Sequence, residues 1–331
     1  MESLWESGIA FVLAMQSLGA WLEAPMEFFS FLGSEEFFLL VLPVLYWSVD
    51  ARLGLRVGVI LLLTGAVNDA FKLTLHAPRP YWFSPEVKAL AFESSFGAPS
   101  GHAQIATGVW GMLASQIRRG WAWGVAIFII FMIGLSRLFL GVHFLHDVLL
   151  GWLVGALVLA ILLRVWDRTA DWVKGQTLGR QVGLAFAFSM LLILGSLLPY
   201  LWLQNWPLPV DWINNAQLAG ATQSELPHPI TLNGVLTTSG TLFGLFAGLA
   251  WMNTQGGFNA RGTATQRILR YALGALGVGI LWFGLGAVFP RGDELVPYIL
   301  RFVRYGLVGL WVSAGAPWLF IKIRLAGSQP G

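Results

Sequence analysis

Long runs of apolar residues constrain this chain more than any other feature of its sequence. Residues 121–141 and 145–165, for example, each offer about 20 mostly apolar positions, the length that an α-helix needs to cross the hydrocarbon core of a bilayer. Backbone polar groups find no water there, so such runs must be helical. The sequence predicts an all-α, polytopic membrane bundle of about nine spans, near residues 35–50, 53–75, 101–117, 121–141, 145–165, 181–203, 231–252, 268–289 and 297–321.

The composition agrees with a membrane protein and excludes other classes. Hydrophobic residues make up 56% of the chain and charged residues only 11%, a ratio that one water-soluble core could not bury. The formal net charge of +3 is too small to indicate a nucleic-acid partner. The absence of cysteine excludes disulfide bonds and thiolate catalysis. We therefore expect the bilayer as a partner and no nucleic acid, and nothing in the sequence indicates an oligomeric state.

The positions of Lys and Arg predict the orientation in the membrane. Both residue types are absent from residues 1–51 and 204–229, and they gather in alternate connections elsewhere. Cytoplasmic loops carry the excess of Lys and Arg, so the N-terminus is expected outside and the C-terminus inside. No cleavable leader is expected, because Glu2 and Glu6 stand where basic leader residues would be. The chain is predicted to be a multi-pass protein of the cell's inner (plasma) membrane.

Three segments follow from these patterns. Residues 1–34 contain a short apolar run with acidic neighbours and are predicted to form an interfacial amphipathic segment. Residues 35–203 form a core that contains the polar motifs, and residues 204–331 form a membrane extension without an assigned role. Near the outer end of the last predicted span, Arg301 and Arg304 lie one turn apart. They either contact a substrate head group or anchor the helix at the interface.

Residues 97–102 read Gly-Ala-Pro-Ser-Gly-His and turn a polar loop into the start of an apolar helix. Pro and Ser favour helix starts, where free backbone N–H groups and the helix dipole attract anions. Gly101 lets an anion approach the backbone closely, and His102 is expected to face the same place from the first turn. The segment therefore indicates an anion site, although a capped helix start beside a lone histidine explains the same pattern.

Cationic side chains stand at the predicted outer ends of two other spans, where few positive charges are expected. Lys72 and Arg79 lie upstream of the anion segment, and Arg137 lies downstream. A cation at such a depth is costly unless it is paired, and the neighbouring segments contain few carboxylates. The predicted partner is an anionic substrate, because Arg binds phosphate bidentately and Lys supplies a compact charge. The alternative is a pair of snorkelling flanks at the membrane surface.

His143 and Asp147 stand four residues apart and are expected to share a helix face and to hydrogen bond. A carboxylate on one ring nitrogen fixes the imidazole tautomer and leaves the other nitrogen as a nucleophile. A satisfied polar pair at the start of a span is the plainer alternative. A metal site on His143, His146 and Asp147 also fits by residue type, but the nearby Lys and Arg side chains would repel a cation.

Taken together, these groups resemble the three signatures of the type 2 phosphatidic acid phosphatase superfamily, in order and in spacing. The resemblance covers roughly residues 35–165. The matching positions are Lys72 with six residues before Arg79-Pro80, then Pro99-Ser100-Gly101-His102, then Ser136-Arg137 with five residues before His143 and three more before Asp147. Smaller features resemble the glucose-6-phosphatase and sphingosine-phosphate phosphatase branches, namely Asn68, Tyr81-Trp82 and Phe96-Gly97-Ala98.

This resemblance implies a phosphatase or diphosphatase with a six-helix core, no metal, no other cofactor and a covalent phosphohistidine intermediate. By the same resemblance, His143 is the nucleophile, Asp147 orients it, and His102 protonates the leaving oxygen and later activates water. The phosphoryl oxygens are held by Lys72, Arg79, Ser100, Gly101 and Arg137. The expected substrate is amphipathic, a lipid or polyprenyl phosphate that reaches the site from the outer face of the membrane.

Other functions fit parts of the same sequence. A phosphotransferase could use the identical site with a different acceptor. A transporter or binding protein for an anionic lipid would explain the many spans, but such a protein has no use for an oriented imidazole beside a second histidine. Vanadium-dependent haloperoxidases share the motifs, yet the number of spans argues against them.

Overall fold

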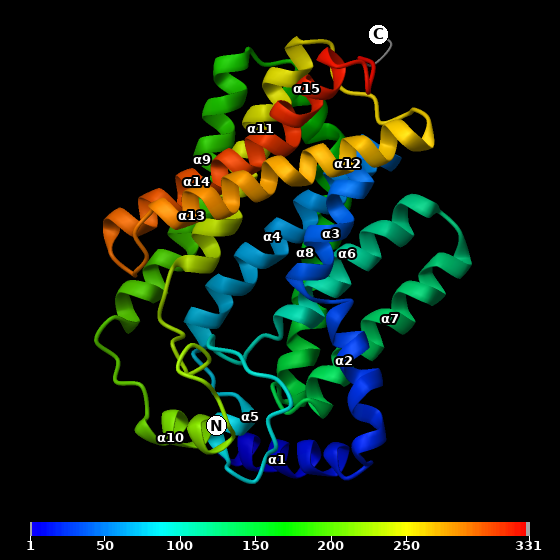
Figure 1. Ribbon diagram of the computed structural model, residues 1–331. Coiled ribbons are helices and arrows are strands. Elements are labelled where there is room, and N and C mark those ends of the chain that lie inside the picture. Colours follow the sequence, from blue (N-terminus) through cyan, green and yellow to red (C-terminus); the bar gives the residue numbers. More distant parts are fainter. Residues whose placement is uncertain (1, 329–331) are drawn as a thin grey trace. The chain divides into compact units, whose positions relative to one another are not determined.

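A computed structural model describes residues 2–328 of the chain (Figure 1). Within these residues every regular element is helical, apart from one isolated bridge between Asn259 and Gly327. The all-α prediction is therefore confirmed.

The α-helices are α1 (Glu2–Gln16), α2 (Glu23–Phe31), α3 (Glu35–Val44), α4 (Ala51–Leu75), α5 (Pro80–Phe83), α6 (Gly101–Ile117), α7 (Gly120–Phe139), α8 (Leu145–Lys174), α9 (Leu178–Leu203), α10 (Val210–Leu218), α11 (Asn233–Thr254), α12 (Ala264–Gly279), α13 (Leu285–Val288), α14 (Leu295–Leu310) and α15 (Ala316–Lys322). A 3-10 turn, η1 (Ala20–Leu22), precedes α2. Three π-helical turns lie between longer helices: η2 (Leu45–Val49), η3 (Ile280–Gly284) and η4 (Trp311–Gly315).

Seven stretches of helix in the described part of the chain are long and apolar enough to cross a membrane, or eight if a bent N-terminal pair counts as one span. This confirms a multi-pass membrane protein but does not confirm nine spans. The predicted span at 35–50 forms the ten-residue α3 and a short π-helical turn. The predicted span at 101–117 forms α6, whose 17 residues reach only about 26 Å. Most of α6 is buried against its neighbours.

The N-terminal segment contains two helices that meet at a sharp bend. Residues Trp5–Gln16 and Ala20–Phe31 enclose an angle of 86°, and the turn between them passes through Gly19 at φ 110°. This φ lies in the left-handed region, which favours glycine. The assignment of residues 1–34 to the membrane interface stays a prediction.

The chain divides into two compact units that interleave along the sequence. The first comprises residues 2–38, 67–160 and 196–231, and the second comprises residues 39–66, 161–195 and 232–328. Every residue of the three motifs belongs to the first unit. The predicted segments, residues 1–34, 35–203 and 204–331, are each continuous in sequence, unlike these units. The roles given to the segments stay predictions.

Close helix packing in the first unit depends on two glycines four residues apart on α8. A Cβ atom at Gly151 would lie 2.7 Å from the carbonyl oxygen of Ser100, and one at Gly155 would lie 2.5 Å from that of Gln104. Glycines with this spacing let two helix backbones approach closely. The start of α8 is thereby held against the start of α6, and the Ser100 N–H donates to the Asp147 carbonyl at 2.9 Å.

The second unit is built around α11 and α14, which lie side by side in Figure 1. Gly240 on α11 faces the backbone of α14, since a Cβ there would lie 2.6 Å from the carbonyl oxygen of Phe302. The indole N–H of Trp47 donates to the Val312 carbonyl at 2.9 Å and ties η2 to η4. Close packing through small residues again sets the helix arrangement.

Candidate active site

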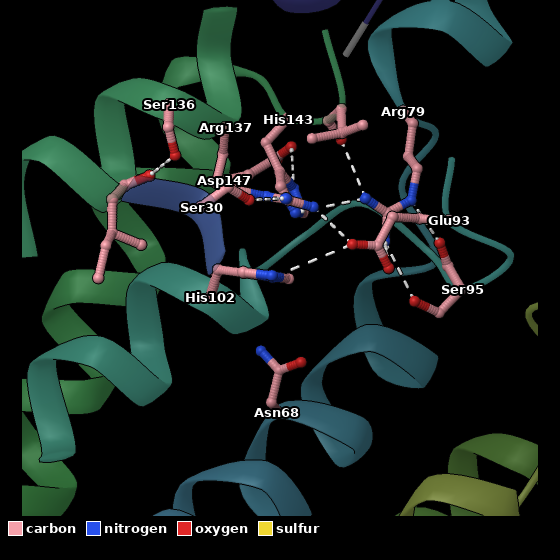
Figure 2. A network of polar contacts seen from close by, with 12 residues as sticks. Ser30, Asn68, Arg79, Glu93, Ser95, His102, Ser136, Arg137, His143 and Asp147 are labelled. Atoms are coloured by element: carbon pink, nitrogen blue, oxygen red, sulfur yellow. Dashed lines mark hydrogen bonds and ion pairs between the residues drawn. The ribbon is translucent and has the colours of Figure 1, made fainter. Parts of the chain in front are cut away.

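Helix ends in the first unit carry the residues that the sequence motifs predicted (Figure 2). Lys72 lies in the last turn of α4, and Arg79 directly precedes α5. Arg137 lies in the last turn of α7, while His143 and Asp147 lie around the start of α8. These cationic and histidine side chains share a set of hydrogen bonds and ion pairs, so the structure brings the three motifs together.

Arg79 is completely buried and joins two loops. Its Nε–H donates to the Ser95 carbonyl at 2.7 Å, and its Nη2–H donates to the Phe96 carbonyl at 3.1 Å. The Nη1 group donates to the Val142 carbonyl at 3.0 Å and lies 3.3 Å from Nε2 of His143. A guanidinium can only donate, so these contacts fix its plane. The loop of residues 84–100 is thereby held against the loop that contains His143.

The contact with Arg79 also assigns the tautomer of His143. Arg79 Nη1 is a donor, so Nε2 of His143 must be the acceptor and carry the lone pair, with the ring proton on Nδ1. Nδ1 lies 3.5 Å from Oδ2 of Asp147. Burial lowers the pKa of His143, and the charges of Arg79 and Arg137 lower it further. The imidazole is therefore neutral, with its lone pair directed at the cationic side of the site.

The expected pairing of His143 with Asp147 on one helix face is wrong in its local structure. Helix α8 begins at Leu145, so His143 precedes it, and Nδ1 of His143 makes no hydrogen bond in the structure. Oδ2 of Asp147 instead accepts from the backbone N–H of Phe144 at 2.9 Å. A carboxylate in the first turn of a helix satisfies free N–H groups there. The carboxylate thus caps the helix start and faces the imidazole across a slightly longer gap.

The start of α6 is shaped as an anion site. Ser100 occupies the N-cap position, yet its hydroxyl makes no capping bond and is buried without a hydrogen-bond partner. Asn68 supports the turn, since its Nδ2–H group donates to the Pro99 carbonyl at 3.1 Å. A Cβ atom at Gly101 would lie 3.2 Å from Oδ1 of Asn68 and 4.0 Å from Nζ of Lys72. The Ser100 hydroxyl and the helix N-terminus are therefore available to an anion.

Glu93 contacts the motif residues although it belongs to none of the three motifs. Its carboxylate forms an ion pair with Nη2 of Arg137, lies 3.7 Å from Nη2 of Arg79, and lies 4.0 Å from Nδ1 of His102. Burial by itself raises the pKa of Glu93, but the charges of Arg79 and Arg137 outweigh it and hold that pKa well below its usual range. The chain therefore supplies an anionic partner for these cations itself, and the predicted substrate partner stays a prediction.

Two serines complete the set of unpredicted contacts. The hydroxyl of Ser95 accepts from Lys72 at 2.8 Å, and the hydroxyl of Ser30 accepts from Nη1 of Arg137 at 2.6 Å. Glu93 could have been suspected as an acidic residue in the polar loop that joins the first motif to the second. No pattern in the sequence distinguishes the two serines.

The alternative of a metal site gains no support from the geometry. Among residues 2–328, no three His, Asp or Glu side chains converge in a way that could hold a metal ion. His146 lies 3.2 Å from Oδ1 of Asp147, but its ring stacks on Phe144, with centroids 5.2 Å apart.

Arg301 and Arg304 belong to the second unit of the chain. Together with Arg291 they line a hollow beside the start of α14, and Nη1 of Arg301 lies 3.3 Å from the Thr237 hydroxyl. Their role in head-group contact or interfacial anchoring stays unassigned.

Comparison with known proteins places these features in a family. Residues 53–171 match the PAP2 superfamily, and residues 236–328 match the transmembrane extension of PAP2 superfamily phosphatases. Glucose-6-phosphatase 3 of Bos taurus is 29% identical over 96% of this chain and 96% of its own length. Sphingosine-1-phosphate phosphatase 2 of Homo sapiens is 32% identical over 42% of this chain and 37% of its own length.

A solved structure also resembles this chain. It is the first transmembrane PAP2 type phosphatidylglycerolphosphate phosphatase from Bacillus subtilis, with 24% identity and a TM-score of 0.44, over 51% of this chain and 88% of that one. The superfamily match at residues 53–171 contains all three motifs, and the second match covers the later helices. The chain therefore belongs to the PAP2 superfamily, a family of membrane phosphatases that act as phosphoric monoester hydrolases.

Proposed function

We propose that this chain removes a phosphoryl group from an amphipathic phosphate or diphosphate, without a metal, through a phosphohistidine intermediate at the outer face of the membrane. The observation that carries the proposal is the orientation of His143. Its Nε2 lone pair faces Arg79, and its Nδ1 faces Asp147. A neutral nucleophile held in one tautomer beside a phosphate-binding guanidinium is suited to phosphoryl transfer.

In this proposal, the cationic residues and the start of α6 bind the phosphoryl oxygens. Lys72, Arg79 and Arg137 neutralise their charge. The hydroxyl of Ser100 and the backbone at Gly101 donate hydrogen bonds from the helix N-terminus. Support comes from the buried polar atoms that lack a hydrogen-bond partner in the structure, which include the Ser100 hydroxyl and Nε of Arg137.

The reaction then proceeds in two steps. In the first, Nε2 of His143 attacks phosphorus; a P–N bond forms as the P–O ester bond breaks, and the leaving oxygen takes the electron pair and a proton from His102. In the second, His102 accepts a proton from water, the water oxygen bonds to phosphorus, and the P–N bond breaks to release phosphate and neutral His143. Asp147 stabilises the imidazolium charge that the first step creates on His143.

Two substrate classes have specific support. A membrane-embedded enzyme meets amphipathic molecules by partition, which favours a lipid or polyprenyl phosphate, and sphingosine-1-phosphate phosphatase 2 is similar over 42% of this chain. Glucose-6-phosphatase 3 of Bos taurus matches 96% of this chain, which favours a water-soluble sugar phosphate as the second candidate.

A phosphate-release assay on the purified chain tests the proposal. The panel contains phosphatidate, phosphatidylglycerophosphate, polyprenyl diphosphate, sphingosine phosphate and glucose 6-phosphate. Release of inorganic phosphate without an added acceptor supports a hydrolase, and release that requires an acceptor identifies a phosphotransferase. Binding of a substrate without turnover would favour a binding or transport protein.

Chelation tests the absence of a metal. We expect the rate of phosphate release to stay nearly unchanged in excess chelator, because the cationic side chains take the place of a metal clamp. Loss of activity that zinc or magnesium restores would contradict this part of the proposal.

A further inference from the structure

The Glu93 carboxylate lies among the side chains that are assigned to the substrate. Figure 2 shows it between His102 and the guanidinium groups of Arg79 and Arg137. A phosphoryl group that contacts both guanidinium groups, with its leaving oxygen beside His102, has to occupy the same region. The region assigned to the phosphoryl group therefore contains an anionic side chain of the protein itself.

The carboxylate and a substrate phosphoryl group cannot share this region. Arg137 donates from Nη1 to Ser30 and from Nη2 to Glu93, so a phosphoryl oxygen that contacts its Nη2 would lie directly beside the carboxylate. Two anions held within about 4 Å of each other repel strongly at a site that is shielded from water. Binding of a phosphate dianion requires that the carboxylate leave.

The backbone of Glu93 is anchored while its side chain can move. The Tyr81 hydroxyl donates to the Glu93 carbonyl and accepts from the Glu93 N–H, both at 3.0 Å. The Glu93 side chain keeps 27% of its surface exposed, whereas that of Arg137 keeps only 3%. Rotation of one side chain toward solvent is therefore enough to vacate the site, and the loop of residues 84–100 need not unfold.

We propose that Glu93 is the resident anion of the phosphoryl site: its carboxylate takes the place of the phosphoryl group when no substrate is bound, and the substrate must displace it to reach His143. This inference rests on the proposed function for the assignment of Arg79 and Arg137 to the phosphoryl oxygens and of His102 to the leaving oxygen. Because one anion replaces the other, both arginines keep an anionic partner throughout the catalytic cycle. It also sets the affinity of the site, because every anionic ligand competes with an internal one.

Equilibrium binding of radiolabelled inorganic phosphate to the purified, full-length chain tests the inference. Glu93→Gln keeps the shape of the side chain but removes the competing charge, so it should bind phosphate about 10- to 100-fold more tightly than the wild type, as expected when one charged hydrogen bond no longer competes. Glu86→Gln is the matched control. Glu86 lies in the same loop and is exposed, and its substitution should leave phosphate affinity unchanged.

The opposite result identifies a different role. Unchanged or weaker phosphate binding by Glu93→Gln, with Glu86→Gln like the wild type, would mean that Glu93 positions the arginines and is not displaced. The binding measurement does not depend on turnover, so it tests the inference separately from the proposed function. A wild type that binds phosphate but releases none from any ester would contradict only the proposed function.

Thermal unfolding covers the case in which Glu93→Gln folds poorly. The substitution leaves Arg137 without its counter-anion, and added phosphate should take that place. We expect phosphate to raise the unfolding temperature more in Glu93→Gln than in the wild type, or to restore folding if the variant is unfolded without it. A variant that saturating phosphate does not stabilise more than the wild type overturns the inference.

Discussion

The two site histidines differ in their surroundings in a way that matches their proposed roles. His143 is buried, with 1% of its side chain exposed, and both ring nitrogens face fixed partners. The side chain of His102 is 21% exposed and has a longer contact, 4.0 Å, to Glu93. A nucleophile benefits from a fixed, shielded position, whereas a group that exchanges protons with a leaving oxygen and with water needs access.

Substitution of each histidine should separate the two roles. We expect His143→Ala to abolish turnover of every substrate, because no P–N bond can form. His102→Ala should slow hydrolysis of an alkyl phosphate on the order of 10²- to 10⁴-fold, because the leaving alkoxide is then not protonated. With p-nitrophenyl phosphate, whose leaving group needs little protonation, the first step should be affected much less. The variant should then accumulate an acid-labile, base-stable phosphoenzyme, measurable with radiolabelled substrate.

Two results would contradict this division. One is a radiolabelled phosphoryl group attached to a serine. The other is a His102→Ala variant that loses the same factor in rate with good and poor leaving groups and accumulates no phosphoenzyme.

Single residues also show where sequence reasoning succeeded and failed. Lys72 and Arg137 were predicted because each lies near the end of a helix whose position the apolar pattern indicates, and Arg79 because it closely follows the first of these helices. Glu93 and Ser95 were not predicted because they lie in the irregular loop of residues 84–100. The course of that loop depends on hydrogen bonds that Arg79, which lies outside the loop, donates to Ser95.

At the level of whole elements, close contact between α6 and α8 positions the proposed catalytic groups. Gly151 and Gly155 of α8 face the backbone of α6, and the Ser100 N–H donates to the Asp147 carbonyl. The spacing of the two glycines was visible in the sequence, but their facing helix was not. Apolar length predicted most of the long helices. It also predicted α6, which has the predicted bounds of residues 101–117 but is too short to count as a membrane span by length.

A side chain at this contact should separate the two helices. We expect Gly155→Val to lower stability by roughly 1–3 kcal/mol, because the new methyl groups overpack a backbone contact. Phosphate release should fall further than the loss of folded protein explains, since α8 carries Asp147. The unfolding temperature and the activity per folded molecule measure the two effects. Gly124→Val on α7 is the control, because a Cβ atom at that glycine meets no heavy atom within 4 Å.

If Gly155→Val behaved like Gly124→Val in both measurements, the close packing of α8 on α6 would not be what positions the active site.

Across the whole molecule, the distribution of charge predicts which side of the membrane the site faces. The loop of residues 84–100 supplies Glu93 and ends at the start of α6. The connection of residues 175–177 between α8 and α9 is flanked by Arg168, Lys174 and Arg180. Cytoplasmic loops carry such clusters, so the two connections belong on opposite sides if α8 crosses the membrane once.

Single cysteines can test this orientation, because the chain has none of its own. Glu86 and Thr177 are both exposed, and each lies in one of the two connections. In intact cells, Glu86→Cys should react with a membrane-impermeant thiol reagent, and Thr177→Cys should react only after the membrane is permeabilised. Equal labelling of both cysteines in permeabilised cells controls for their reactivity, and phosphate release shows that each variant is folded. Labelling of Thr177→Cys but not of Glu86→Cys in intact cells would place the active site on the cytoplasmic side, where its substrate would have to be a cytoplasmic phosphate ester or a lipid of the inner leaflet.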